Sequence, residues 1–250
     1  PPHQSSAASD VYKRQVQSMV QRGLEDKGIK VILKSQIENI TKISDGLTVT
    51  LGDKKRLITD EIICATGRKP NIENLGLEKL GINLKEGAVL VDDYQQTNIS
   101  NVYAIGDVTD KINLTPVAIA EGQAFSDREF GNKKRFISYD NVPSAVFSQP
   151  PVSVVGLTLE DTKKLNIKAK EFVSEFNPLK NTITGKQEKT LMKLVVDEND
   201  KVLGAHMLGD YSPEIIQGIA VSIKAGAKKS DFDATIGIHP TAAEEFVTMK

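Results

Sequence analysis

The fold of the chain's second half is decided by the stretch Thr190-Leu-Met-Lys-Leu-Val-Val-Asp-Glu-Asn-Asp200-Lys-Val-Leu-Gly-Ala-His-Met-Leu208. Two apolar runs in it, 190–196 and 202–208, predict strands. The four residues between them, 197–200, are acidic or amide side chains that favour a turn. The stretch therefore predicts a pair of strands joined by a tight connection.

Further strands precede this pair, and a helix follows it. We expect strands at 144–148, 153–155 and 169–176. Ser212-Pro213 begins a predicted helix with its apolar side chains on one face, and Gly226 ends it. Consecutive strands with helices grouped beside them favour an α+β domain with an antiparallel sheet.

The first 140 residues follow a different order, in which a helix is followed by strands and then by a second helix. The predicted elements are a helix at 16–27 ended by Gly28, a strand at 29–33, a hairpin of strands 37–43 and 47–51, strands at 61–65, 87–91 and 101–105, and a helix from Thr115 to Phe130. We expect Thr115 to be the N-cap of the last helix, with Pro116 as its first residue. This order is typical of the end of an α/β nucleotide-binding domain.

The composition gives no case for nucleic acid or an anionic membrane as a partner. The formal net charge is −1, and no apolar run approaches the roughly 20 residues of a membrane helix.

We expect no metal site. Cys64 is the single cysteine, so we expect a buried core residue, no internal disulfide and a cytoplasmic protein. Residues 1–15 lack periodic apolar positions, and we expect them to be disordered.

Two glycine-containing segments are candidate ligand sites. Gly106-Asp107 follows a predicted strand, where α/β sheets bind ligands, and the Asp107 carboxylate suits polyol hydroxyls. The helix from Thr115 presents free N–H groups that favour negative charge nearby. The alternative is that Asp107 and Thr115 only cap a turn and a helix. Gly67-Arg68 allows close approach of a ligand or of another part of the backbone.

The C-terminal residues His239-Pro-Thr-Ala-Ala-Glu244-Glu245 place a histidine beside two carboxylates. His239 and Glu244 are the candidate acid–base pair. A structural histidine is the alternative for His239. Glu244 has another role as well, because Thr241 to Glu244 has the spacing of a capping box.

Four motifs together resemble the back half of glutathione reductases, in the class I pyridine nucleotide-disulfide oxidoreductase family. They are Ala65-Thr-Gly67-Arg68-Lys-Pro-Asn71, Ala104-Ile-Gly106-Asp107, Leu114-Thr-Pro-Val-Ala-Ile-Ala-Glu-Gly122 and His239-Pro-Thr-Ala-Ala-Glu244-Glu245-Phe246. The resemblance covers residues 16–250. It implies an α/β remnant of FAD- and NAD(P)-binding domains followed by an α+β dimerisation domain. The implied boundaries are 16–70 for the end of the NADPH domain, 71–140 for the end of the FAD domain and 141–250 for the dimerisation domain.

The resemblance also implies cofactors and roles. Asp107 would contact the FAD ribityl chain, and Thr115 would face the isoalloxazine ring. The Val146 carbonyl would lie near the nicotinamide of NADPH. His239 would protonate a departing thiolate in the active site of the second subunit, and Glu244 would orient its imidazole. Gly67 and Arg68 would belong either to a domain crossover or to the cofactor site.

The sequence departs from the resemblance at three points. Gln123 stands where many glutathione reductases carry an arginine for a glutathione carboxylate, and it cannot form a charge-assisted fork. The redox cysteine pair and the Gly-x-Gly-x-x-Gly fingerprint are missing. We therefore expect a C-terminal fragment of an NADPH-dependent homodimeric reductase of glutathione disulfide, inactive by itself. The alternatives are a fragment of dihydrolipoamide dehydrogenase or another relative, and a dimerisation module without catalysis.

Overall fold

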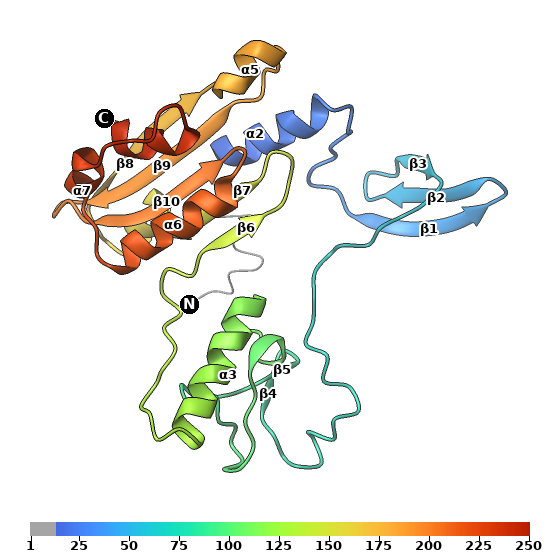
Figure 1. The fold of residues 1–250 in the computed structure, drawn as a ribbon. Coiled ribbons are helices and arrows are strands. Elements are labelled where there is room, and N and C mark those ends of the chain that lie inside the picture. Colours follow the sequence, from blue (N-terminus) through green and yellow to red (C-terminus); the bar gives the residue numbers. More distant parts are fainter. Residues whose placement is uncertain (1–13) are drawn as a thin grey trace.

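The computed structural model describes residues 14–250. Of the segment 1–15 that we expected to be disordered, residues 1–13 lie outside this range, and the prediction is wrong for Arg14 and Gln15, which begin the helix α2. Its largest unit is a five-stranded antiparallel sheet in the order β6-β7-β10-β9-β8 (Figure 1). The strands are β6 Ser144–Val146, β7 Val152–Gly156, β8 Ala169–Phe176, β9 Thr190–Asp197 and β10 Val202–Leu208. The predicted antiparallel α+β domain is confirmed, and the carboxylate of Asp197 holds the β9–β10 turn by accepting from the N–H groups of Asn199 and Lys201.

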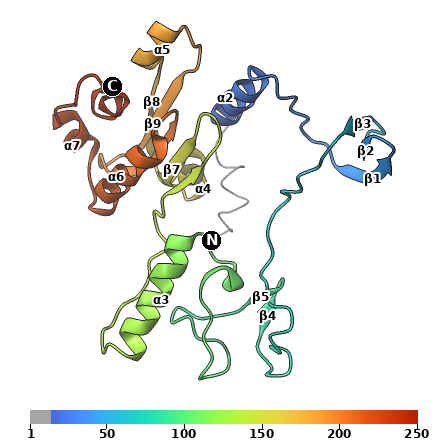
Figure 2. The same cartoon turned by 45° about the vertical axis from the view of Figure 1, so that its right-hand side comes forward.

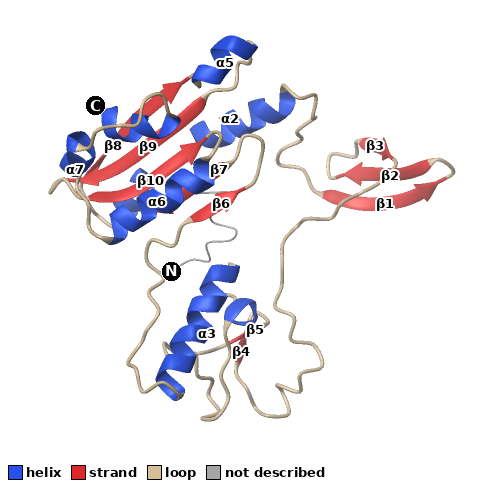
Figure 3. Ribbon diagram, viewed as in Figure 1, coloured by secondary structure: helices blue, strands red, loops and turns tan. Residues whose placement is uncertain are grey.

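One face of this sheet is covered by helices from the C-terminal part of the chain (Figure 3). They are α6 Ser212–Lys224, α7 Lys229–Ala234, the 3-10 turn η2 Ala242–Glu244 and α8 Glu245–Thr248. Alternate residues of β9, Met192, Leu194 and Val196, point to this face and are fully buried. Two shorter helices, α4 Leu159–Lys164 and α5 Leu179–Thr184, lie in the connections of β8.

The opposite face of the sheet is covered in part by α2, Arg14–Glu25, which comes from the other end of the chain (Figures 1 and 2). Val16 of α2 is buried against Leu191 and Leu208, and Met19 and Val20 pack around them. The Lys27 ammonium group donates to the carbonyl of Gln149 at 2.8 Å. The sequence predicted this helix but not its packing on the C-terminal sheet.

The region between α2 and the sheet domain carries two smaller units. A three-stranded antiparallel sheet contains β1 Ile37–Ile43, β2 Gly46–Leu51 and β3 Arg56–Thr59, and it confirms the predicted hairpin. The second unit contains β4 Leu84–Lys85, β5 Ala88–Val89, the 3-10 turn η1 Gly106–Thr109 and the helix α3 Thr115–Glu129. The turn η1 packs against α3, where a Cβ at Gly106 would lie 3.0 Å from the Ala118 Cβ, and Figure 2 shows β4 and β5 on the far side of the connecting loops.

Several predictions for this region are wrong. Residues 29–33, 61–65 and 101–105 form no strand, and only an isolated bridge joins Gln96 to Tyr103. Cys64 is exposed rather than buried. A strand requires a neighbour that accepts its hydrogen bonds, and within residues 14–250 nothing pairs with 29–33 or 61–65. Most of their large apolar side chains therefore stay exposed, namely Ile29, Ile32, Leu33 and Ile63.

The start of α3 also differs from the prediction. Leu114 is the N-cap, in an extended conformation and without a side-chain hydrogen bond, and Thr115 is the first helical residue. Pro116 therefore occupies the second position, where its missing N–H is equally harmless. Among the helices that the structure describes, none is long and apolar enough to span a bilayer.

Candidate functional site

His239 and Glu244 lie together at the C-terminal end of the chain. The imidazole Nδ1 is 3.1 Å from both carboxylate oxygens of Glu244. The His239 side chain is 81% exposed, and that of Glu244 is 20% exposed. Because a carboxylate only accepts, Nδ1 carries the proton of this contact and Nε2 is the atom left to face outward. The arrangement presents an oriented imidazole that can give or take a proton at Nε2.

The Glu244 carboxylate has a second partner in the main chain. The N–H of Thr241 donates to Oε1 at 3.3 Å, which confirms the predicted capping box at η2. The same carboxylate thus caps the start of η2 and holds the His239 imidazole, so Glu244 makes the contacts of both interpretations that the sequence left open.

The segment that carries the pair is held by contacts with the core, with β8 and with α7. Phe246 and Met249 are buried in the core, with 2% and 4% exposure. Glu245 accepts a hydrogen bond from the Ser174 hydroxyl of β8 at 2.8 Å. The Lys229 ammonium group donates to the carbonyl of Met249 at 2.9 Å. These contacts fix α8, and therefore Glu244, relative to the sheet.

Gly106 and Asp107 form the start of η1 rather than the end of a strand. Gly106 has a φ of 71°, and a Cβ there would lie 3.0 Å from the Ala118 Cβ of α3. Glycine is therefore required both by the backbone conformation and by the close approach of α3. The carboxylate of Asp107 is about half exposed, and its nearest cation is the Arg68 guanidinium at 3.6 Å.

Two of the predicted residues, Arg68 and Asp107, thus form an ion pair. Gly67, by contrast, has open space around the position of a Cβ, so no close approach explains the glycine. Its φ of 132° does explain it, because residues with a side chain rarely adopt this conformation. The chain bends at Thr66 and then brings the Arg68 guanidinium to Asp107 of η1.

Thr115 and Val146 are both solvent-facing. Thr115 is exposed at the first turn of α3, and Val146 is 49% exposed at the end of β6. Gln123, on the same helix as Thr115, donates to the carboxylate of Asp127 at 3.0 Å. That carboxylate also accepts from the Arg135 guanidinium at 3.1 Å. One amide hydrogen of Gln123 is therefore engaged within its own helix.

Sequence reasoning missed Glu121, the most enclosed acidic residue near these groups. It is 1% exposed, and its two oxygens accept from the Gly106 N–H and the Tyr139 hydroxyl, both at 2.6 Å. The helical spacing of Val117, Glu121 and Ala124 places all three on the buried face of α3. This spacing was the available signal for an inward-facing glutamate.

The predicted residues form two groups rather than one. The C-terminal segment that carries His239 and Glu244 belongs to the sheet domain, whereas η1 and the start of α3 lie in the other unit of the chain (Figures 1 and 2). No contact joins the two groups within the described residues. A single copy of the chain does not bring His239 to Asp107.

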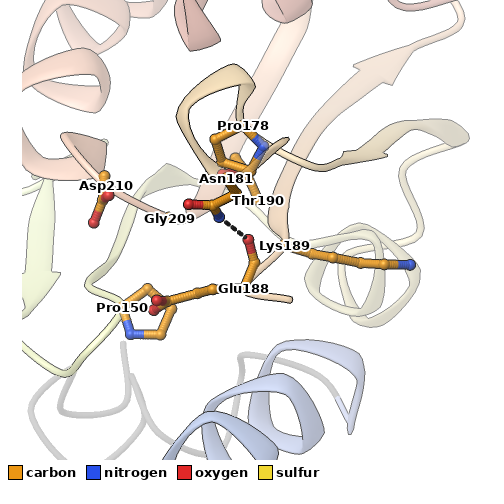
Figure 4. Close-up of a pocket in the computed structure, with 8 residues that line it drawn as sticks. All are labelled: Pro150, Pro178, Asn181, Glu188, Lys189, Thr190, Gly209 and Asp210. Atoms are coloured by element: carbon orange, nitrogen blue, oxygen red, sulfur yellow. Dashed lines mark hydrogen bonds between the residues drawn. The ribbon is translucent and has the colours of Figure 1, made fainter. Parts of the chain in front are cut away.

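A small, partly open pocket at β9 contains none of the predicted residues. It has a volume of about 10 Å³, and Figure 4 shows the side chains that line it, including Asn181, whose amide donates to the Glu188 carbonyl at 2.6 Å. Such a volume holds a single water at most. A larger open groove of about 590 Å³ lies between α2 and the sheet, and it also contains none of the predicted residues. In residues 14–250, no cluster of three histidine, cysteine or acidic side chains offers a metal site.

Comparison with known proteins identifies two family regions. The pyridine nucleotide-disulphide oxidoreductase family matches residues 3–122, which begins inside the segment 1–15 set aside above. The dimerisation domain of the same family matches residues 142–250. The two regions cover most of the chain in the order expected.

Individual relatives agree with this result. The chain is 46% identical to a glutathione reductase of Nostoc sp., covering 96% of this chain and 56% of that protein. It is 48% identical to the chloroplastic/mitochondrial glutathione reductase of Pisum sativum, covering 84% and 39%, and 44% identical to a trypanothione reductase of Trypanosoma congolense, covering 89% and 46%.

Among solved structures, the chain is similar to the HOCl-induced flavoprotein disulfide reductase RclA from Escherichia coli. The TM-score is 0.87 at 27% identity, over 96% of this chain and 56% of that one. The chain spans about half the length of the curated relatives it matches. From the two matched regions and these relatives, the chain belongs to the pyridine nucleotide-disulphide oxidoreductase family, in the part that includes the glutathione reductases.

Proposed function

We propose that the chain forms the C-terminal part of an NADPH-dependent FAD enzyme that reduces glutathione disulfide. In this proposal, residues 16–70 end the NADPH domain, 71–140 end the FAD domain and 141–250 form the dimerisation domain of a cytoplasmic homodimer. Support comes from the glutathione reductase relatives and from the two family regions. The observation that carries the proposal is the exposed His239 imidazole held at 3.1 Å by the Glu244 carboxylate.

The residues near η1 are compatible with an FAD site. Asp107 has a half-exposed carboxylate on a turn fixed by Gly106, which suits hydroxyl groups of a sugar-like chain. The positive end of the α3 dipole lies at the exposed Thr115 and favours negative charge. Pro116 has no N–H, and the N–H groups of Val117 and Ala118 donate to the Leu114 carbonyl, so the Thr115 N–H is the donor left in this turn. When bound, FAD would supply two-electron transfer from a nicotinamide to a disulfide.

NADPH would be recognised only in part by this chain. We propose that the Val146 carbonyl lies near the nicotinamide and that Gly67 and Arg68 shape the crossover between the two domains. The 3.6 Å contact between Arg68 and Asp107 supports a role for Arg68 in holding η1 and its carboxylate.

The role of His239 is proton transfer to the sulfur that leaves when the substrate disulfide is split. A thiolate leaves at lower energy when an oriented acid protonates it, and such groups contribute about 100- to 10,000-fold. Glu244 keeps the proton on Nδ1 and turns Nε2 outward. Since His239 lies far from η1 within one copy, the site it serves belongs to the second subunit of the dimer.

The test uses the full-length enzyme that contains these 250 residues. His239→Gln should cut turnover of glutathione disulfide by about 100- to 10,000-fold. Flavin reduction by NADPH, followed by stopped-flow absorbance, should be unchanged because it does not need this proton. His206→Gln, a change at the buried histidine of β10, should lower the melting temperature without this loss. Normal turnover by His239→Gln would return His239 to a structural role.

The isolated chain provides a second check. It contains one cysteine and lacks the Gly-x-Gly-x-x-Gly fingerprint, so it has no path for electrons to a disulfide. Purified residues 1–250 mixed with NADPH, FAD and glutathione disulfide should match the blank. Sustained NADPH oxidation would contradict the proposal that the chain is inactive without the rest of the enzyme.

A further inference from the structure

The Glu121 carboxylate lies at the centre of a buried cluster that the proposed reaction does not use. Its side chain comes from the inner face of α3, and the residue is 1% exposed. Oε2 accepts from the main-chain N–H of Gly106 at 2.6 Å, and Oε1 accepts from the hydroxyl of Tyr139 at 2.6 Å. A buried glutamate without partners would cost several kcal/mol, so both contacts are needed to keep it there.

The two partners of Glu121 belong to different functional segments. Gly106 precedes Asp107 at the start of η1, and the hydroxyl of Thr109 closes that turn by donating to the Gly106 carbonyl at 2.8 Å. Tyr139 lies in the connection that leads from α3 to β6, where Val146 is located. Burial, and then the neighbouring Glu121 carboxylate, raise the pKa of the Tyr139 phenol, so Tyr139 stays a hydrogen-bond donor.

We propose that Glu121 is a positioning residue that fixes η1 through the Gly106 N–H and so holds the Asp107 carboxylate in place for FAD. This inference rests on the proposed FAD site at Asp107. Glu121 contacts the η1 main chain at one atom, the nitrogen of Gly106. Gly106 is directly followed by Asp107, the residue that would touch the cofactor. A shift of η1 would move Asp107 directly. η1 lies close to α3 at this point, since a Cβ at Gly106 would be 3.0 Å from the Ala118 Cβ.

Three variants of the full-length protein separate this role from general stability. Glu121→Gln keeps an oxygen for the Gly106 N–H, so FAD affinity should be close to that of the parent. Glu121→Met has a similar length but no acceptor, and FAD should bind about 10-fold more weakly or worse. Asp127→Asn removes another buried carboxylate of α3 whose contacts, to Gln123 and Arg135, do not reach η1. It should lower the melting temperature and leave FAD affinity unchanged.

The readout is FAD release, measured as flavin fluorescence on dilution, together with the flavin midpoint potential and the melting temperature. Equal FAD affinity in the Gln and Met variants, with only the melting temperature lowered in Glu121→Met, would overturn the inference. If Glu121→Met does not fold, Glu121→Ala replaces it, and FAD affinity equal to that of Glu121→Gln would overturn the inference in the same way. Asp107→Ala tests the underlying FAD site. If Asp107→Ala binds FAD normally, the proposed site itself is wrong. If Asp107→Ala binds FAD weakly while Glu121→Met binds it normally, only the role of Glu121 is refuted.

Discussion

The Lys229 ammonium group of α7 donates a buried hydrogen bond to the main-chain carbonyl of Met249, with a distance of 2.9 Å. Lys229 is only 3% exposed, and its ammonium group also lies over the ring of Phe172 and contacts Asp233. A lysine this enclosed is retained by specific partners rather than by water. Met249 is the C-cap of α8, which directly follows Glu244 of the candidate acid–base pair. The hydrogen bond from Lys229 therefore ties this C-terminal segment to α7.

Lys229→Met should therefore destabilise the protein. The methionine fills most of the space but leaves the Met249 carbonyl buried without a donor, which costs about 1–3 kcal/mol. Urea unfolding of the full-length enzyme should show this loss, and Lys224→Met, an exposed change on α6, should not. A Lys229→Met protein as stable as the parent would show that the hydrogen bond does not anchor the C-terminal segment.

Glu244→Ala should combine a catalytic loss with a stability loss. The His239 imidazole would lose its orienting partner but keep its proton chemistry, so turnover should fall less than in His239→Gln. The capping contact with the Thr241 N–H would be lost as well, which costs about 0.5–2 kcal/mol. Steady-state kinetics and thermal unfolding of the same preparation test both parts, and a variant with normal turnover would leave Glu244 with capping alone.

A hybrid dimer tests whether His239 serves the second subunit. In the full-length protein, one copy carries His239→Gln and the other carries Asp107→Ala. The first copy keeps its own cofactor site and receives His239 from the second, so co-expression should restore activity that neither homodimer shows. Separate affinity tags on the two copies allow the hybrid to be purified. An inactive hybrid that still holds flavin in its His239→Gln copy, about half the flavin content of the parent dimer, would mean that each site uses the histidine of its own subunit.

The ion pair of Asp127 with Arg135 should make stability depend on acid pH. The hydrogen bond from the Arg135 guanidinium is the main cause that lowers the pKa of Asp127 in the folded state. A lowered folded-state pKa stabilises the protein above the unfolded-state value of about 3.9, and this contribution disappears as the pH falls through the folded-state pKa.

The measurement compares the parent with Asp127→Asn in thermal unfolding between neutral pH and about pH 3. The difference in melting temperature should be constant at neutral pH and shrink below about pH 4. Thermal curves that remain equally far apart through the acid range would mean that the Asp127 charge does not contribute.

The sequence was sufficient for the local elements whose signals lie within the segment. β8 and β10 have the predicted bounds, and the β9–β10 turn forms at its acidic residues. Alternation of apolar residues and turn chemistry act over a few residues, so they can be seen before the fold is known. The same holds for Glu244, whose spacing from Thr241 predicted the capping box.

Strands that need a distant neighbour were not decided by the sequence. The runs 29–33 and 61–65 have strand-like composition, yet no strand forms because nothing pairs with them in the described chain. Cys64 is exposed for the same reason. Apolar composition shows that a segment can be buried, but only a partner supplies the hydrogen bonds that make it a strand.

The site shows the same division between sequence and tertiary structure. The sequence alone was enough to propose His239, Glu244 and Asp107 as the candidate residues, because they belong to short motifs with a readable spacing. Only the tertiary structure decided that Glu121 points inward to Gly106, that Arg68 meets Asp107 and that α2 packs on the C-terminal sheet. Each of these contacts joins segments far apart in sequence, and their geometry depends on how the whole chain packs, which no local pattern encodes.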